Sequence, residues 1–147
     1  MIIGRDRMIK FIKSNSMKID VLEKQEHFLS NKEKIKNALT RTDVVAFDIF
    51  DNETLIGFVM LKSFDDGCYF LWDFAIDYRY QNKNYGTESL KELIKYMNEN
   101  YQMNTMTTTY TYGNNHAKHI YEKIGFIETD IVNNDKCHEV NMIYKVN

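Results

Sequence analysis

The stretch from residue 44 to residue 76 constrains the fold most, because three β-rich segments follow one another with only short polar turns between them. The segments cover residues 44–50, 55–64 and 68–76. The turn clusters between them are Asp51-Asn52-Glu53-Thr54 and Asp65-Asp66-Gly67. Connections this short join neighbouring antiparallel strands. The sequence therefore predicts an antiparallel meander.

Helices and further strands are predicted on either side of this meander. Apolar residues at positions 90, 93, 94 and 97 have the i, i+3, i+4, i+7 spacing of an amphipathic helix. Residues 105–111 are rich in β-branched side chains and predict a strand, and residues 127–146 predict a closing hairpin that turns at 133–135. Near the amino terminus, Met8, Phe11 and Ile12 predict one helix, and residues 28–39 predict a second. The order of elements predicts a mixed α+β fold.

Composition and charge exclude several classes of protein. The chain has 147 residues, of which 44% are apolar and 27% are charged, and it has no repeat or linker, so we expect residues 1–147 to form a single domain. The net charge of −2 argues against nucleic acid as a partner. No stretch has the apolar length of a membrane span or of a secretory signal. We expect a cytoplasmic protein that does not bind membranes.

A polar loop at residues 81–87 separates the third strand of the meander from the amphipathic helix. Backbone N–H groups and the positive end of the helix dipole converge at such a point and suit a pyrophosphate. Gly86 allows the backbone to approach a ligand, and Asn84 tolerates a positive φ. Lys83 and Thr87 can add a positive charge and a hydroxyl donor. The loop lacks both the G-x-x-x-x-G-K-[ST] pattern and the three glycines of a dinucleotide site, which argues against a kinase or dehydrogenase.

A second motif covers residues 114–126. Asn114 or Asn115 is placed to cap the start of a helix, and Gly125 suits the left-handed turn at its end. The helix carries Tyr121 on the same face as Ala117.

Together the two motifs resemble the GNAT superfamily of N-acetyltransferases. Residues 81–86, Gln-Asn-Lys-Asn-Tyr-Gly, match [RQ]-x-x-G-x-[GA] with asparagine at the first glycine, and residues 114–126 match N-x-x-A-x-x-x-Y-x-x-x-G-F. The resemblance covers residues 44–146. It implies a V-splayed, mostly antiparallel sheet of six to seven strands flanked by about four helices. Because residues 1–4 are short for a first strand, we expect that strand to be shortened or missing.

The resemblance also implies acetyl-CoA as co-substrate and no metal. In such enzymes the pantetheine arm pairs with the backbone of the strand before the loop. An N–H there, expected to be that of Ile76, stabilises the tetrahedral oxyanion. The residues expected to bind the cofactor are Phe74, Ala75, Ile76, Gln81, Asn82, Lys83, Asn84, Tyr85, Gly86, Thr87, Asn115 and Tyr121.

Two side chains are expected to be catalytic. Tyr121 would act as general acid toward the coenzyme A thiolate, since a phenol has a pKa of about 10. The alternative is a tyrosine that only fills the core. Asp73 would accept a proton from the acceptor amine, and a similar acidic-aromatic step occurs in spermidine/spermine acetyltransferases. The alternative is an aspartate at a strand bulge or in an edge ion pair.

The resemblance implies that the earlier half of the chain forms most of the acceptor site, and the charge of this half favours a cationic acceptor. Residues 18–77 carry twelve acidic and seven basic residues, whereas residues 78–147 carry eight of each. Residues 23–29 also resemble the segment before the second helix of bacterial polyamine and diamine acetyltransferases. The alternative is a solvated acidic face. The residues expected to bind the acceptor are Glu23, Glu26, Trp72 and Asp73.

The predicted function is direct transfer of acetyl from acetyl-CoA to a primary amine, with a polyamine or another small cationic amine as the acceptor. The alternatives are a protein or peptide amino group as acceptor, and a non-catalytic module that binds acyl-CoA. His116 and His119 lack a third ligand nearby, so no metal site is predicted. The closing hairpin and a shortened first strand leave edges on which a homodimer can form.

Overall fold

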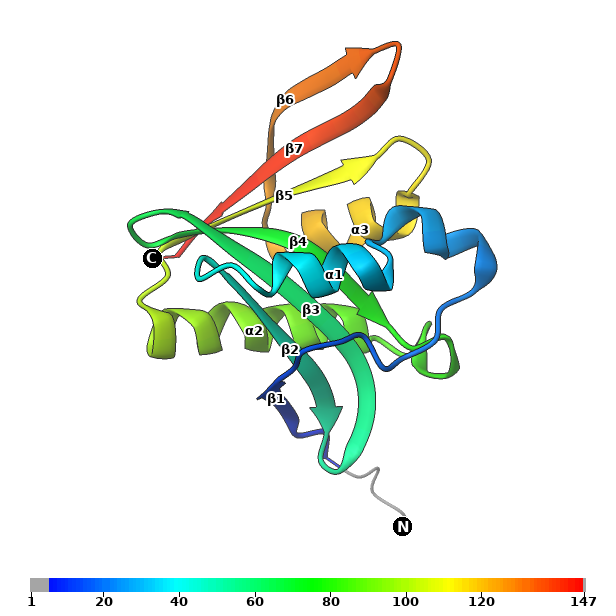
Figure 1. Cartoon of the computed structure of the whole chain (residues 1–147), viewed down its shortest axis with the longest axis vertical. Coiled ribbons are helices and arrows are strands. Elements are labelled where there is room, and N and C mark those ends of the chain that lie inside the picture. Colours follow the sequence, from blue (N-terminus) through cyan, green and yellow to red (C-terminus); the bar gives the residue numbers. More distant parts are fainter. Residues whose placement is uncertain (1–5, 147) are drawn as a thin grey trace.

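A seven-stranded sheet in the order β1-β2-β3-β4-β5-β7-β6 organises the chain (Figure 1). The computed structural model describes residues 6–146, so residues 1–4, on which the expectation of a shortened first strand rests, lie outside the described residues. Neighbouring strands are antiparallel except for β4 and β5, which are parallel. The strands are β1 (Ile9–Lys13), β2 (Val44–Asp51), β3 (Thr54–Asp65), β4 (Cys68–Ile76), β5 (Thr105–Thr111), β6 (Ile127–Asn134) and β7 (Cys137–Lys145).

Helices cover both faces of this sheet (Figure 1). Apolar side chains of α2 and α3 form the larger core with one face. Ile35 and Ala38 of α1 form a smaller core with the other face, over β2, β3 and β4. None of the helices between residues 6 and 146 has the length and apolar character needed to cross a bilayer. The α-helices are α1 (Lys32–Ala38), α2 (Tyr85–Tyr101) and α3 (Asn115–Ile124), and the 3-10 helices are η1 (Glu23–Phe28) and η2 (Tyr78–Tyr80).

The predicted meander is confirmed as β2, β3 and β4, which pair antiparallel in chain order. Because α2 carries the chain from the end of β4 back to the start of β5, these two strands run parallel. The predicted closing hairpin is confirmed as β6 and β7. The fold is therefore the mixed α+β fold that was expected, with seven strands in its sheet.

The helix predicted around Met8, Phe11 and Ile12 is instead the strand β1, which pairs with β2. Ile9 and Phe11 alternate toward the larger core, where the ring centroid of Phe11 lies 5.2 Å from that of Tyr96 on α2. Ile12 points away from the larger core and is exposed, as is Met8. The helical spacing of these two residues therefore does not mark a buried face. For this reason residues 6–146 contain three α-helices where about four were expected.

Candidate active site

The two halves of the sheet separate between β4 and β5. Their parallel pairing runs from Cys68–Thr105 to Leu71–Thr108 and, among the described residues, extends no further. Beyond this point β4 continues to pair with β3, and β5 continues to pair with β7. A V-shaped gap therefore opens between residues 72–76 and the end of β5.

A β-bulge at Trp72 lies where the gap begins. In the register of β3 and β4, Met60 opposes Asp73 and Leu61 opposes Leu71, which leaves Trp72 as an extra residue. The extra residue places Leu71 and Asp73 on opposite faces, although they are two positions apart. Leu71 packs in the larger core, whereas Asp73 lies on the α1 face.

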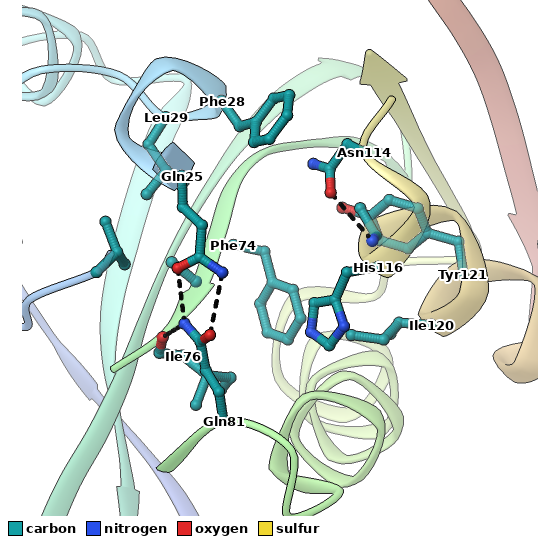
Figure 2. A pocket seen from close by; sticks show the side chains of 13 residues that line it. Gln25, Phe28, Leu29, Phe74, Ile76, Gln81, Asn114, His116, Ile120 and Tyr121 are labelled. Atoms are coloured by element: carbon teal, nitrogen blue, oxygen red, sulfur yellow. Dashed lines mark hydrogen bonds between the residues drawn. The ribbon is translucent and has the colours of Figure 1, made fainter. Parts of the chain in front are cut away.

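The second half of β4 presents backbone groups to the gap. The N–H of Asp77 donates to the carbonyl of Ile56 on β3 at 2.8 Å. By alternation along the strand, the N–H groups of Phe74 and Ile76 point away from β3. A slot of about 90 Å³, which we call the β4 slot, lies between β4, η1 and α3, and is lined on its β4 side by Phe74, Ala75 and Ile76 (Figure 2).

Two glutamines bridge one end of the β4 slot (Figure 2). Gln81 Nε2 donates to the Ile76 carbonyl at 2.8 Å and to Gln25 Oε1 at 3.0 Å. Gln25 Nε2 donates in return to Gln81 Oε1 at 3.0 Å. The side chain of Gln81, predicted to bind the cofactor, is thus joined to β4 and to η1.

The N-terminus of α2 opens onto a groove of about 130 Å³ beside the β4 slot, which we call the α2 groove. Asn82 and Asn84 have φ values of 61° and 70°, and Asn84 is the N-cap of α2, which confirms that Asn84 tolerates a positive φ here. His116, His119 and Lys123 of α3 line the groove opposite the loop. A helix N-terminus facing a lysine suits an anionic group such as a phosphate.

Two of the predicted loop residues serve packing. A Cβ on Gly86 would lie 2.8 Å from Ile120 Cδ1, so the missing side chain allows α2 to approach α3. Tyr85 is buried, and its hydroxyl donates to Asp51 Oδ2 at 2.5 Å. The backbone of both residues still lies at the start of α2.

Three other predicted residues lie in different parts of the site. Thr87 is buried and lines the α2 groove. Lys83 does not line this groove, and its Nζ lies 6.0 Å from the ring centroid of Tyr80. Trp72 lies near α1, where Lys34 Nζ is 5.8 Å from the centroid of its ring.

Tyr121 lies on α3 and is 6% exposed. It packs in the larger core, with its ring centroid 5.4 Å from that of Phe126, and it also lines the β4 slot. Burial raises the pKa of its hydroxyl, the neighbouring Thr108 hydroxyl lowers it, and the charge of Asp73 raises it again, so that the net shift is upward. The phenol is therefore protonated at neutral pH and can donate a hydrogen bond or a proton.

Asp73 is 3% exposed. Its Oδ1 accepts from the Ser30 N–H at 2.9 Å, whereas its Oδ2 is buried and has no hydrogen-bond partner among the described residues. Burial raises the pKa of this carboxyl by more than the Ser30 hydrogen bonds and the charge of Lys34 lower it. A buried carboxyl with a raised pKa and an unpaired oxygen can accept a proton from a ligand.

One cavity of about 740 Å³, which we call the Asp73 cavity, is lined by both Asp73 and Tyr121. Its walls come from η1, α1, β4, β5, β7 and α3. Glu26 and Glu139 line it together with Asp73, and Lys34 carries the opposite charge. The lining thus has three acidic side chains and one lysine.

Asn115 and Glu23 also lie outside the β4 slot and the Asp73 cavity. Asn115 is exposed and lines a separate depression beside η1, whereas Asn114 lines the slot and caps α3, its Oδ1 accepting from the Ala117 N–H at 3.3 Å. Glu23 is exposed on η1 and lines neither the slot nor the cavity.

Several site residues were not singled out from the sequence. Glu139 reaches the Asp73 cavity because it pairs with Thr111 across β5 and β7, a register that no local pattern predicts. Thr108 closes the base of the gap, where its hydroxyl donates to the Leu71 carbonyl at 3.3 Å. Gln25 reaches Gln81 from 56 positions away. Asn114, by contrast, could have been chosen from the sequence, because it stands at the first position of the second motif.

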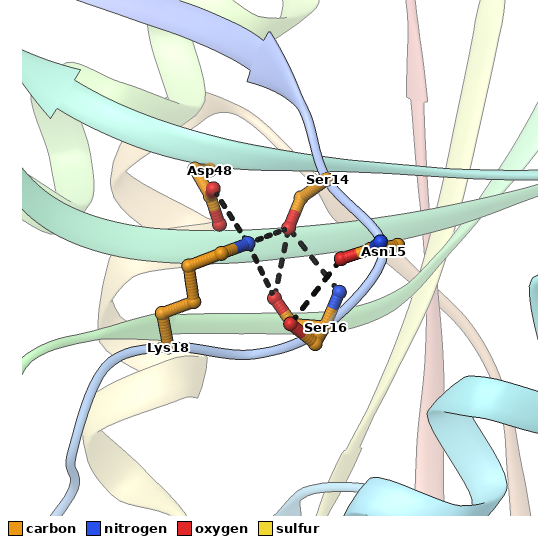
Figure 3. Close-up of polar contacts among 5 residues, drawn as sticks. All are labelled: Ser14, Asn15, Ser16, Lys18 and Asp48. Carbon is orange, nitrogen blue, oxygen red and sulfur yellow. Dashed lines mark hydrogen bonds and ion pairs between the residues drawn. The ribbon is translucent and has the colours of Figure 1, made fainter.

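The segment before η1 is fastened to the sheet at two points. Lys18 Nζ donates to Asp48 Oδ2 on β2 at 3.0 Å and to Ser14 Oγ at 2.9 Å (Figure 3). Further along, the N–H of Asp20 donates to Asp77 Oδ2 at 3.2 Å. These contacts fix where η1 begins, and η1 forms one wall of the site.

Metal ligands do not gather in this site. Within residues 6–146, the His, Cys, Asp and Glu side chains form no group of three or more that could hold a metal ion. His116 and His119 lie in the α2 groove.

Comparison with protein families gives a match over most of the chain. Residues 14–126 match the model of the Acetyltransferase (GNAT) family. This range includes the β4 slot, the α2 groove and both of the motifs. No curated protein matches the chain in sequence.

Solved structures are similar in fold. A GNAT family acetyltransferase from Elizabethkingia anophelis with acetyl-CoA bound is 17% identical, covers 94% of this chain and 98% of its own, and gives a TM-score of 0.71. An IAA acetyltransferase from Bacillus cereus is 12% identical, covers 96% of this chain and 100% of its own, and gives a TM-score of 0.72. The dodecameric spermidine N-acetyltransferase from Vibrio cholerae is 19% identical, covers 77% of this chain and 71% of its own, and gives a TM-score of 0.63. At these identities the similarity concerns the fold.

Proposed function

The chain belongs to the acetyltransferase (GNAT) family, and from this premise we propose that it transfers acetyl from acetyl-CoA directly to a primary amine, with a polyamine or another small cationic amine as the acceptor.

The observation that carries this proposal is the pairing of Asp73 and Tyr121 in one cavity. They come from the two sides of the gap, and both are buried. An ammonium must lose a proton before its nitrogen can attack, and Asp73 Oδ2 is available to accept it directly or through a water. A thiolate leaving group must be stabilised, and the protonated phenol of Tyr121 can donate to it. The presence of a possible base and a possible acid in one cavity supports the proposal.

The chain also offers a fit for acetyl-CoA, which supplies the acetyl thioester when bound. The N–H groups of Phe74 and Ile76 face the β4 slot, where they can pair with a pantetheine arm and with a developing oxyanion. The N-terminus of α2 and Lys123 face the α2 groove and can hold a pyrophosphate. Because the slot and the groove share Ile76 and Gln81 in their linings, one extended ligand can occupy both.

The charge around the Asp73 cavity supports a cationic acceptor. Glu26, Asp73 and Glu139 line the cavity, and their charges exceed that of Lys34. Clefts lined by charges of one sign concentrate ligands of the opposite sign. A fold shared with a spermidine N-acetyltransferase agrees with this choice of acceptor.

A thiol-release assay tests the proposal. Free coenzyme A is measured as acetyl-CoA is mixed with spermidine, spermine, short diamines, amino acids and peptides. We expect the highest kcat/KM with amines that carry two or more positive charges. Turnover with peptides alone would favour the protein or peptide alternative. Binding of coenzyme A without turnover of any amine would favour the non-catalytic alternative.

A further inference from the structure

The pair formed by Gln25 and Gln81, which we call the Gln25–Gln81 brace, links two parts of the site that are far apart in sequence (Figure 2). Gln25 lies on η1, and Gln81 lies between β4 and the loop that begins α2. Each side chain donates one hydrogen bond to the other at 3.0 Å. The two residues thus form a reciprocal amide pair across the end of the β4 slot.

Backbone groups at both ends fix the orientation of this pair. Gln81 Nε2 donates to the Ile76 carbonyl at 2.8 Å, so its Oε1 must face Gln25. At the other end the Leu22 N–H donates to Gln25 Oε1 at 3.2 Å, so Gln25 must direct its Nε2 toward Gln81. Neither amide can turn over without losing a backbone hydrogen bond.

The brace joins the cofactor side of the site to the acceptor side. At one end it holds Ile76, whose N–H faces the β4 slot. At the other end it holds η1, whose Glu26 and Phe28 line the Asp73 cavity. The loop that lines the α2 groove follows Gln81 directly.

We propose that Gln25 is a positioning residue that couples the binding of coenzyme A to the shape of the Asp73 cavity. The inference rests on the proposed function, because it assigns the β4 slot and the α2 groove to coenzyme A and the Asp73 cavity to the amine. A ligand that orders Gln81 and Ile76 also orders η1 through the brace. Two ligands that bias one shared element must affect each other's affinity by the same factor.

The first test compares the Gln25→Met variant with the wild type. Methionine keeps the length of the side chain and removes all hydrogen bonds of the amide. In the wild type, coenzyme A should tighten the binding of the best amine of the panel, measured by calorimetry. In Gln25→Met this enhancement should fall by about 3-fold to 10-fold, the loss expected for one or two hydrogen bonds. The affinity for coenzyme A alone is measured in both proteins as the reference, since Gln25 also lines the β4 slot.

Lys36→Met is the matched control, because Lys36 is exposed on α1 and lines neither the β4 slot nor the Asp73 cavity. It should retain the full enhancement. If coenzyme A enhances amine binding in Gln25→Met as much as in the wild type, the coupling role is wrong and Gln25 only supports the fold. The same conclusion follows if each ligand binds more weakly to Gln25→Met by a factor that does not depend on whether the other ligand is present.

The second test uses the Gln25→Glu variant. A carboxylate still accepts from Gln81 Nε2 and from the Leu22 N–H, but it cannot donate to Gln81 Oε1. Lowering the pH protonates it and restores a donor. Relative to the wild type at the same pH, the enhancement should be reduced at pH 7 and should return toward wild type as the pH falls below the ordinary glutamate pKa of about 4.3. If the ratio of the enhancement in Gln25→Glu to that in the wild type stays constant with pH, the proposed hydrogen-bond pattern is wrong.

A third measurement separates failure of this inference from failure of the proposed function. Amide hydrogen exchange of residues 22–29 is recorded with and without coenzyme A and needs no acceptor. We expect coenzyme A to protect these residues in the wild type and not in Gln25→Met. If no amine is acetylated but this difference is present, the proposed function is wrong and the brace stands. If protection is the same in both proteins, the brace is wrong whatever the activity.

Discussion

Asp73 and Tyr121 lie in one cavity, and burial favours the neutral form of each. The negative charge of Asp73 disfavours a second negative charge on Tyr121. A carboxyl with a raised pKa can take up a proton, and a protonated phenol can donate one. The pair therefore suits a reaction in which one reactant loses a proton and another gains one.

Replacing Tyr121 with phenylalanine removes the hydroxyl and keeps the ring in the core. We expect kcat to fall by about 100-fold, since a positioned proton donor contributes on this order. The affinity for coenzyme A, measured by calorimetry, should change little. Tyr112→Phe is the control, because Tyr112 is exposed and packs beside His138. An unchanged kcat in Tyr121→Phe would remove this residue from the mechanism.

Asp73→Asn should lower activity and raise stability at neutral pH. Asparagine can still accept from the Ser30 N–H, but it cannot take up a proton. Because the pKa of Asp73 is raised in the folded protein, its stabilising effect is present below its ordinary pKa and is lost as pH rises through the raised value. We expect the variant to be about 1 kcal/mol more stable at pH 7, measured by urea unfolding, with the gain disappearing toward pH 3.

The matched control for Asp73→Asn is Asp66→Asn, which makes the same change at an exposed turn. It should leave both kcat and stability near wild type. A destabilised Asp73→Asn at pH 7 would mean that the ionised carboxylate has a stabilising partner in solution.

Among the elements, the contact between α2 and α3 depends on Gly86. A Cβ at this position would press against Ile120 Cδ1, and the two helices carry opposite walls of the α2 groove. We expect Gly86→Ala to cost about 1 kcal/mol in urea unfolding and to weaken the binding of coenzyme A. Adding Ile120→Val removes the clashing methyl group and should restore both.

Gly113→Ala provides the contrast to Gly86→Ala. A Cβ there meets no atom within 4 Å, but φ is +95°, so the cost is backbone strain. Ile120→Val should not rescue it. Equal rescue of both glycine variants would show that Ile120→Val stabilises the protein by an unrelated route.

Asp77 fastens the end of β4 to the segment that leads to η1. Its buried carboxylate binds the Arg79 guanidinium at 2.9 Å and the Asp20 N–H at 3.2 Å, and the Arg79 hydrogen bonds chiefly lower its pKa to about 2. A lowered pKa adds stability above the ordinary value of 3.8, and this stability is lost as pH falls through about 2.

Asp77→Asn should therefore cost on the order of 1 to 2 kcal/mol at pH 7, and the difference from wild type should shrink between pH 4 and pH 2. Unfolding by urea across this range measures it. Asp43→Asn breaks the exposed Arg41–Asp43 pair and should leave the unfolding midpoint unchanged. A difference for Asp77→Asn that does not depend on pH would mean that the loss is one of packing.

For the whole molecule, the uneven distribution of charge predicts a salt-dependent KM. Residues 18–77 supply most of the negative charge, and Glu26 and Asp73 from this range meet Glu139 in the Asp73 cavity. We expect the KM for a cationic amine to rise several-fold between low and high ionic strength. Glu139→Gln should raise KM by about 3-fold at low salt and make it less dependent on salt, without a matching loss of kcat. A KM that does not respond to salt would argue against a charged acceptor.

How much of the molecule the sequence predicts depends on how local the signal is. The meander was predicted because each strand is bounded by its own turn residues. β1 was not, because five residues with two lysines carry too little periodicity to distinguish a strand from a helix. Asp73 and Tyr121 were chosen through the motifs around them. Gln25 and Glu139 could not be chosen, since their contacts depend on how η1 and β7 are placed by the folded sheet. The homodimer that the sheet edges would allow stays a prediction.

Because of the bulge at Trp72, the face on which each residue of β4 lies depends on the exact number of residues in this stretch of the strand. Leu71 and Asp73 differ by an even number of residues and yet lie on opposite faces, so the count of residues between them matters as much as their identity. A deletion at this point would turn the Asp73 carboxylate away from its cavity or send Leu71 out of the core, even though neither residue had been altered. Directed evolution of this protein should therefore allow substitutions at positions of β4 other than Asp73 more readily than a change in the length of the strand.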